Sequence, residues 1–322
     1  TPMKLAKFAL VGLVAAFAAP VAAQTTLTMN HPLPINSHYG AGAVAFKEDI
    51  ERRTNNRIRV NIQRNDNERE NIEALQIGTG DLTITSTGPV GNFVPETRIF
   101  DIPFLFRDYA HARGVLDSQI GQDVLARFPA RNIIALAWLE NGFRNMTNSR
   151  REVSKPDDVR GLKVRTMENQ VHMQAFRTMG ALPTPMAFSE LVPALQQGTV
   201  DGQENPIPVI VANNLNQVQR YLSLTRHVYS PAMLLMSPAA WNRLNDADKA
   251  AFREAAKAAQ AANRARVSAD EESGVDELRR RGMTVTTTVD MAGFQSAMNP
   301  AMEGWGREFG AANIERIRAW RP

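Results

Sequence analysis

Cysteine is missing from this chain of 322 residues, which excludes disulfide bonds, thiolate nucleophiles and cysteine-ligated zinc or iron–sulfur sites. The glycine-rich motifs that bind nucleotide phosphates are missing too, as are the His-Glu-x-x-His and Gly-x-Ser-x-Gly motifs of metallohydrolases and serine hydrolases. None of the five histidines lies at metal-ligand spacing from another, and no nucleophile stands beside a base. We therefore expect no cofactor, no metal and no catalytic residues, and we predict a binding protein rather than an enzyme.

An excess of charge of one sign is also lacking. Lys and Arg number 37 against 33 Asp and Glu, and the two signs are mixed along the chain. This balance argues against a nucleic-acid-binding surface. With 43% hydrophobic residues the composition is that of a globular protein, and the length predicts two domains at roughly 150 residues per domain.

The first 23 residues have the three parts of a secretion signal. Lys4 and Lys7 precede an apolar stretch at 8–19, and small residues follow at 21–23. The apolar stretch is too short for a membrane span, which needs about 20 residues. We predict a signal peptide at residues 1–23, cleaved after Ala23, and a periplasmic mature protein; the alternative is a buried N-terminal helix.

Strand and helix patterns alternate along the rest of the chain. Period-two or continuous apolar runs predict strands, and helical periodicity predicts amphipathic helices. The predicted strands are 26–30, 57–63, 81–85, 132–138, 160–165 and 221–227, and two predicted helices are 38–53 and 68–77. This order indicates an α/β protein with largely parallel sheets, in which 132–138 is buried on both faces.

Residues 246–281 differ from the rest because Ala, Glu, Lys and Arg dominate and proline is absent. They predict one long helix, weakened near Ser273-Gly274. At 1.5 Å per residue it is about 54 Å long, more than the width of one small domain. We therefore expect this helix to span two lobes.

Three polar segments adjoin predicted strands: 140–144, 162–165 and the predicted turn at 200–206. In open α/β sheets ligands bind beyond the carboxyl ends of the strands. The planar fork of arginine suits a carboxylate, so Arg144 and Arg165 are the leading candidates for an anion site. The alternative is that each arginine pairs with a nearby acid for structural reasons.

Longer motifs lie around these arginines. They are RNMTN at 144–148, PDDVRGLKVR at 156–165, GALPTPMAFSEL at 180–191 and ALQQGTVDGQENP at 194–206, with FDIPFLF at 100–106 and YLSLT at 221–225. In these motifs the chain closely resembles the solute-binding proteins of TRAP transporters, the DctP-like family. The resemblance implies a two-lobe periplasmic-binding-protein fold of the α/β class, with a long helix across both lobes, that closes on a small organic acid.

The resemblance also implies roles for single residues. Arg165 matches the arginine that pairs with the substrate carboxylate, Arg144 a second arginine, and Asn205 a ligand-contacting asparagine. Phe188 matches a residue that often lines the pocket. The pocket-facing loops of the first lobe fall on Asn30, His31, Ser86 and Thr87. The Gln-Leu-Gly that many members carry ahead of residue 68 is replaced here by Asn65-Asp66-Asn67, which leaves the far end of the ligand undefined.

The function that this resemblance implies is an extracytoplasmic solute receptor. It would bind a small organic-acid anion (a C4-dicarboxylate, sugar acid, 2-oxo acid or aromatic acid) and deliver it to TRAP permease subunits in the membrane. We expect a monomer. The alternatives are a periplasmic ligand sensor for a histidine kinase and an enzyme on the same scaffold. The predicted lobes are 24–141 plus 231–270, and 142–230 plus 271–322.

Overall fold

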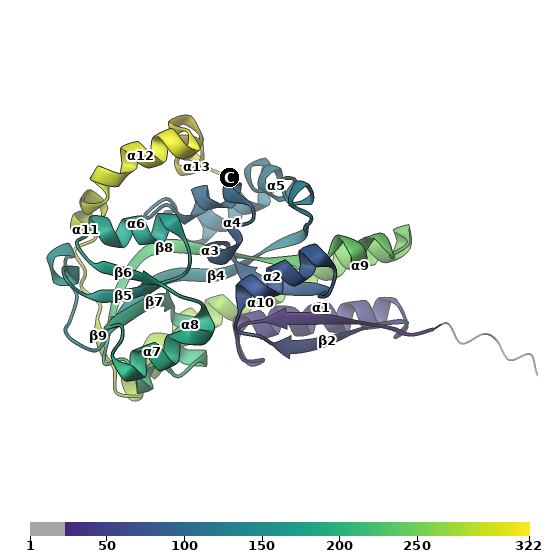
Figure 1. Cartoon of the computed structure of the whole chain (residues 1–322), viewed down its shortest axis with the longest axis horizontal. Coiled ribbons are helices and arrows are strands. Elements are labelled where there is room, and N and C mark those ends of the chain that lie inside the picture. The colour runs from purple at the N-terminus through teal and green to yellow at the C-terminus, as the bar shows by residue number, and fades with distance from the viewer. Residues whose placement is uncertain (1–22) are drawn as a thin grey trace, which may run out of the picture.

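The computed structural model describes residues 23–322, so the predicted signal peptide lies almost entirely outside the described residues. One mixed sheet runs through the protein (Figure 1), in the order β2-β1-β3-β8-β4-β7-β5-β6, with β9 beside β8. The strands are β1 Thr25–His31, β2 Ile58–Arg64, β3 Leu82–Ser86, β4 Ile134–Asn148, β5 Lys163–Thr166, β6 Leu182–Pro185, β7 Gly202–Pro206, β8 Tyr221–Met236 and β9 Thr284–Thr286.

Helices cover both faces of this sheet. The first are α1 His38–Arg53, α2 Glu68–Ile77, α3 Thr87–Val90, α4 Tyr109–Asp117, α5 Gln119–Leu125, α6 Gln170–Thr178 and α7 Leu191–Gln197. The remainder are α8 Ile207–Ala212, α9 Pro238–Asn242, α10 Asp246–Arg280, α11 Met291–Ala297, α12 Asn299–Phe309 and α13 Ala311–Ala319. Short 3-10 helices lie at Pro95–Asp101, Pro129–Arg131, Pro156–Val159, Phe188–Glu190 and Leu215–Gln217. Asparagine side chains cap α2, α6 and α10, as the sequence favours.

Two long antiparallel strands, β4 and β8, join the two parts of the sheet. Near the carboxyl end of β8, residues 232–236 pair with β3, which leads to β1 and β2. Near the carboxyl end of β4, residues 144–148 pair with β7, which leads to β5 and β6. The fold therefore has the predicted two lobes, and β4 and β8 run from one to the other. The boundaries assigned to those lobes from the sequence stay a prediction.

The long helix is confirmed, and α10 extends for 35 residues along both parts of the sheet (Figure 1). The predicted weakening near Ser273-Gly274 is wrong, because the helix is continuous there. Gly274 allows α10 and α8 to pack closely, because a Cβ atom at this position would lie 2.4 Å from Cγ2 of Ile207 on α8. A larger residue would push α8 away from α10.

Three other expectations from the sequence need correction. The sheet is mixed rather than largely parallel, because β4 pairs antiparallel with both β7 and β8. The run 132–138 is not buried throughout: residues 134–137 are half-buried, since this end of β4 has a strand neighbour on one side only. Finally, 140–144 and most of the turn predicted at 200–206 are strand, in β4 and β7. Gly142, at φ +129°, accompanies the bulge in β4 between Glu140 and Gly142.

The C-terminal segment contacts both predicted lobes. α12 lies against α6, whereas α13 lies against α4. There the His111 ring nitrogen Nε2 is 2.7 Å from the carbonyl oxygen of Ile317, and the Trp320 ring stacks on the His111 ring. Because α4 precedes residue 141 in the chain, this segment connects the two halves of the molecule on the side opposite α1.

Candidate functional site

A narrow cavity lies where the carboxyl ends of β3 and β5 face each other. Both parts of the chain line it, the part before β4 and the part between β4 and β8. Its walls are Pro32, Leu33, Tyr39, Glu68, Ser86, Asn141, Arg165, Met167, Phe188, Asn205 and Val209. A second narrow space adjoins it and shares Glu68, Arg165, Met167 and Phe188. This position matches the general rule that α/β proteins bind ligands beyond the strand ends.

Arg165 is the one cation among the described residues that lines the main cavity. Its side chain is buried, with 2% exposed, and its Nε and Nη2 atoms donate to the Met186 carbonyl oxygen at 3.1 and 2.9 Å. Parallel pairing of β5 with β6 brings Met186 to this position. Within residues 23–322 no carboxylate pairs with Arg165 and no acceptor faces its Nη1 atom. Burial and repulsion from Arg144 lower the pKa of Arg165 to about 10, so the guanidinium stays charged but lacks a counterion.

Arg144 is buried as well, but its charge is matched. Its Nε and Nη2 atoms donate to the two carboxylate oxygens of Glu204 at 2.5 and 2.9 Å, a bidentate pair across β4 and β7. The other side of Glu204 lies 3.0 Å from the His227 Nε2 atom. Burial opposes ionisation, yet Arg144 and His227 hold the pKa of Glu204 well below its ordinary value. The structural alternative weighed from the sequence therefore describes Arg144, which lies behind the cavity wall.

Asn205 connects this pair to the cavity. Its Oδ1 atom accepts from Arg144 Nη2 at 3.3 Å, and its Nδ2 atom donates to Gln203 Oε1 at 2.6 Å. The side chain is held on both sides while one face lines the cavity. Phe188 lies on the same wall, with the Arg165 guanidinium carbon 5.9 Å from the centre of its ring.

The positions predicted in the first lobe divide into two groups. Ser86 lines the cavity, at the carboxyl end of β3. Asn30, His31 and Thr87 do not line it. His31 is buried and its Nδ1 atom accepts from the Leu33 backbone N–H, while Thr87 donates to Asp101 at 2.6 Å. For these three residues, as for Arg144, a ligand-binding role stays a prediction.

Glu68 is the charged cavity residue that the sequence did not indicate. It is the first residue of α2, where a carboxylate is common because it complements the helix dipole, so its presence carried no functional signal. Its Oε2 atom accepts from Thr85 Oγ1 at 2.5 Å and from the Ser86 backbone N–H at 3.4 Å. Its Oε1 atom has no hydrogen-bond partner among the described residues. Burial raises the pKa of Glu68 against the opposing effect of these hydrogen bonds.

Tyr39 and Asn141 also line the cavity and were not predicted as site residues. Asn141 lies inside β4, and its Oδ1 atom is 3.0 Å from His38 Nε2. Burial lowers the pKa of His38 to about 4, so this ring is neutral at pH 7 and donates from Nε2 to the amide oxygen. The Asn141 Nδ2 group donates one N–H to Ser230 Oγ at 3.5 Å, which leaves its second N–H as a donor beside the cavity. Asn141 belongs to the polar segment 140–144 that the sequence indicated, whereas a tyrosine inside an amphipathic helix carries no distinguishing pattern.

Side chains from the two parts of the chain meet around the cavity. Asn169, the cap of α6, donates from Nδ2 to Asp101 Oδ2 at 2.8 Å and to the Gly88 carbonyl oxygen at 3.2 Å. At the surface, Arg69 Nε lies 3.4 Å from Glu168 Oε2, and Asn92 Nδ2 donates to the Glu168 carbonyl oxygen. Arg69 is therefore a half-exposed partner of Glu168, whereas Trp138 is a packing residue whose indole N–H donates to Gly121.

Comparisons with known proteins agree with this architecture. The model of bacterial extracellular solute-binding protein family 7, named DctP, matches residues 29–308. A solute-binding protein of Verminephrobacter eiseniae (strain EF01-2) is 51% identical over 304 residues, which are 94% of this chain and 91% of that protein. This chain belongs to solute-binding protein family 7. The resemblance to TRAP solute-binding proteins found in the sequence is confirmed.

Two crystal structures of TRAP periplasmic solute-binding proteins are similar to this family 7 chain over its full fold. The one from Polaromonas sp JS666, bound to D-erythronate, has a TM-score of 0.92 and 53% identity. The one from Bordetella bronchispeptica, with density assigned as pantoate, has a TM-score of 0.91 and 53% identity. Each match covers 93% of this chain and 100% of the other chain. The two-lobe fold with its long helix is therefore that of the family.

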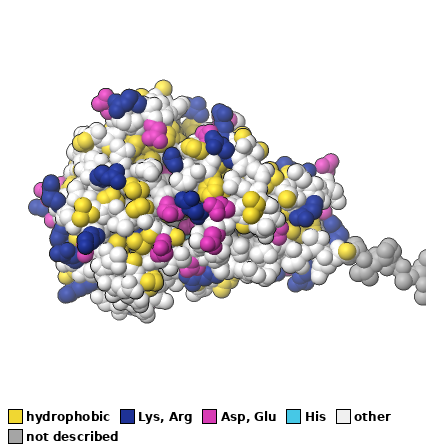
Figure 2. All heavy atoms as spheres, viewed as in Figure 1, with side chains coloured by type: hydrophobic (Ala, Val, Ile, Leu, Met, Phe, Trp, Pro, Cys, Tyr) yellow, Lys and Arg dark blue, Asp and Glu magenta, His cyan; other side chains and the backbone are white. Residues whose placement is uncertain are grey.

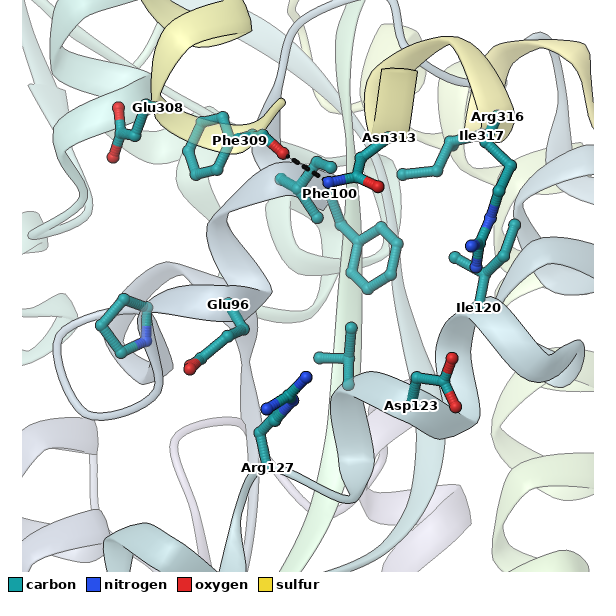
Figure 3. Close-up of a pocket in the computed structure, with 13 residues that line it drawn as sticks. Glu96, Phe100, Ile120, Asp123, Arg127, Glu308, Phe309, Asn313, Arg316 and Ile317 are labelled. Atoms are coloured by element: carbon teal, nitrogen blue, oxygen red, sulfur yellow. Dashed lines mark hydrogen bonds between the residues drawn. The ribbon is translucent and has the colours of Figure 1, made fainter. Parts of the chain in front are cut away.

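A larger depression of this family 7 protein lies elsewhere, between the 95–101 segment and α5 on one side and α12 and α13 on the other (Figure 3). Its floor includes Phe100 and Ile317, and its rim carries charges of both signs, among them Glu96, Asp123 and Arg127. It lies away from the carboxyl ends of β3 and β5, and its rim mixes the two signs of charge. The smaller cavity with Arg165 is thus the candidate ligand site.

The outer surface carries no field of one sign on the face drawn in Figure 2, where acidic and basic side chains are interspersed. This agrees with the expectation from composition. No helix within residues 23–322 is long and apolar enough to cross a bilayer. The described residues also hold no cluster of three or more His, Asp or Glu side chains that could bind a metal ion.

Proposed function

We propose that this protein is a receptor for a small organic-acid anion, which it delivers to the membrane subunits of a TRAP transporter. The observation that supports this most directly is Arg165, a buried guanidinium without a counterion among the described residues, in a cavity between two lobes. Leaving a charge buried and unmatched is costly, so a ligand carboxylate that supplies the counterion gains binding free energy. Two donor positions, Arg165 Nη1 and Asn141 Nδ2, are placed to receive it.

The ligand that we propose is a hydroxylated acid of about four to six carbons. The cavity is narrow and leaves little free space between the lobes, which favours a short acid over larger ones, aromatic ones included. The two similar structures hold D-erythronate and density assigned as pantoate, both short hydroxy acids. Polar groups on several walls, Ser86, Asn141 and Asn205 among them, suit such a ligand better than an apolar one.

A thermal-shift screen of organic acids tests this function. A true ligand binds the folded state and should raise the melting temperature in proportion to RT ln(1 + [L]/Kd), which is about 2.7 kcal/mol at one hundred times Kd. We expect short hydroxy acids to give the largest shifts, with sugar acids of greater length and aromatic acids giving less. No shift with any short carboxylate would contradict the proposal.

We also propose that the protein is exported and acts in the periplasm after cleavage of the signal peptide behind Ala23. The charge pattern of residues 1–23 supports this. Mass spectrometry of the protein recovered from the periplasm should show Gln24 as the first residue. A different first residue in that fraction would show that cleavage does not occur after Ala23.

Closure of the two lobes around the ligand is the step that we propose links binding to transport. The Asn169 contacts with Asp101 and Gly88 connect the parts of the chain on either side of the cavity, so they belong to the closed arrangement. Asn169→Asp keeps the cap of α6 but replaces the donor by a carboxylate facing Asp101. We expect this variant to need about tenfold more ligand for closure at about pH 9, where both carboxyl groups ionise and like charges oppose closure.

Solution scattering with and without ligand measures this effect through the radius of gyration. Burial already raises the pKa of Asp101 to about 7 while Asn169 donates to it, and a facing carboxylate in place of that donor should raise the pKa further, so the two carboxyl groups of the variant should share a proton near neutral pH. Protonation removes the repulsion, and closure of the variant should therefore recover at pH 6. A variant that closes like the wild type at about pH 9 would show that the Asn169 contacts do not control closure.

A further inference from the structure

The cavity contains two opposite charges that do not meet. Arg165 and Glu68 line both adjoining spaces, yet they form no ion pair within the described residues. Each is held to its own wall: Arg165 by the Met186 carbonyl oxygen, and Glu68 by Thr85 and Ser86. Each also keeps one unused atom, Nη1 of Arg165 and Oε1 of Glu68. A molecule that fits between them can therefore accept from the first and donate to the second.

No further uncommitted cation from residues 23–322 lines the main cavity. The charge of Arg144 is matched by Glu204 through two hydrogen bonds. Arg69 lines only the adjoining space, where it is half exposed and pairs with Glu168. A second ligand carboxylate reaching toward Glu68 would thus meet a negative charge without a positive one to offset it.

We propose that Glu68 determines ligand selectivity: it requires a hydroxyl group on the ligand and excludes dicarboxylates, so the site accepts hydroxylated monocarboxylates. This rests on the proposed function and makes it more specific. A ligand hydroxyl donates to the Glu68 carboxylate, a charge-assisted hydrogen bond, while the ligand carboxylate lies on Arg165. Discrimination then comes from repulsion of a second carboxylate as well as from the bond to the hydroxyl.

Three four-carbon acids separate these effects at constant chain length. D-Erythronate carries one carboxylate and hydroxyl groups, butyrate carries one carboxylate alone, and succinate carries two carboxylates. Calorimetry at pH 7.5 on the full mature chain should rank D-erythronate ahead of the other two for the wild type. In Glu68→Gln we expect the Kd for D-erythronate to rise about tenfold to a hundredfold, since a hydrogen bond to a charged group is lost.

The same variant should bind succinate about tenfold more tightly than the wild type does, because the repulsion is gone. Butyrate, which does not use Glu68, should change little. Glu68→Asp keeps the charge but retracts it, so it should weaken D-erythronate while still excluding succinate. Glu70→Gln, an exposed acid on the same helix, is the matched control and should leave all three constants unchanged.

The outcomes distinguish this inference from the proposed function. If the wild type binds D-erythronate but Glu68→Gln weakens all three acids equally, Glu68 has a structural role and the inference is wrong. It is also wrong if wild-type protein binds succinate as tightly as D-erythronate. If no acid of any kind binds the wild type, the proposed function itself fails. Melting of each variant without ligand shows that the fold is retained.

Discussion

Arg165→Ala should weaken binding of the stabilising acid by about 30-fold to several thousand-fold while the protein stays folded. Removing one partner of a buried charge pair costs roughly 2–5 kcal/mol, which sets this range. The loss should be large because Arg165 is the one uncommitted cation that the main cavity offers among residues 23–322. Titration calorimetry with the acid that gives the largest thermal shift measures the effect.

Two further variants test whether Arg165 binds the ligand through the planar N–H groups of its guanidinium. Arg165→Lys should also bind poorly, because a single ammonium group cannot hold the Met186 carbonyl oxygen and present a further planar N–H to the ligand. Asn205→Ala removes a neutral amide, whose hydrogen bonds contribute about 0.5–1.5 kcal/mol each, so its loss should be smaller. A Kd for Arg165→Ala within about threefold of the wild-type value would remove the carboxylate-binding role from this residue.

Much of the architecture follows from local patterns. The apolar periodicity of α1 and α2 predicted both helices at the residues where they occur, and composition predicted α10 to within one residue. Arg165 was predicted at a strand end, and β5 extends one residue beyond it. These features could be predicted because the spacing of apolar residues shows which face of a helix or strand is buried.

The polar strands could not be predicted in this way. Glu140 and Asn141 in β4 and most of β7 are polar yet buried, because their partners lie on distant elements. Glu140 accepts from Arg113 and Tyr229, for example, and its backbone N–H donates to Asn263 on α10. Local reasoning interprets such residues as loops, since burial without a partner would be costly. These hydrogen-bond partners can be identified only from the three-dimensional structure, in which the distant elements lie together.

In the candidate site, too, some residues could be predicted from local sequence and others could not. Arg165 stood out in the sequence because an arginine at a strand end suits a carboxylate and this one matches a family motif, whereas Glu68 has the ordinary appearance of an acid in the first turn of a helix. Arg144 looked equivalent to Arg165 from sequence. What separates the two is Glu204, which the β4–β7 pairing brings beside Arg144: Pro206 is the register partner of Arg144, and Glu204 is that of Met146. A single sequence does not contain that register.

Glu204→Gln should lower the free energy of unfolding by about 3–5 kcal/mol, the usual cost of leaving one member of a buried ion pair without its partner. Arg144 would keep its contacts with the carbonyl oxygen of residue 204, with Asn205 Oδ1 and with Ser230 Oγ, but it would lose the charge that balances it. Urea denaturation measures the change. Glu168→Gln is the matched control: its partner Arg69 is half exposed, so the loss should stay within about 1 kcal/mol.

The pH dependence of the unfolding free energy, measured for the wild type and for Glu204→Gln, tests the same ion pair. Although burial opposes it, Arg144 and the His227 hydrogen bond hold the pKa of Glu204 below its ordinary value of 4.5. A carboxyl whose pKa is lower in the folded state stabilises the protein above its unfolded pKa, and that contribution is lost as the pH falls toward the folded value. Glu204→Gln has no such group. The difference in unfolding free energy between wild type and variant should therefore narrow progressively as the pH falls below about 4.5. A difference that stays constant down to about pH 3 would mean that the ion pair is not what Glu204 contributes.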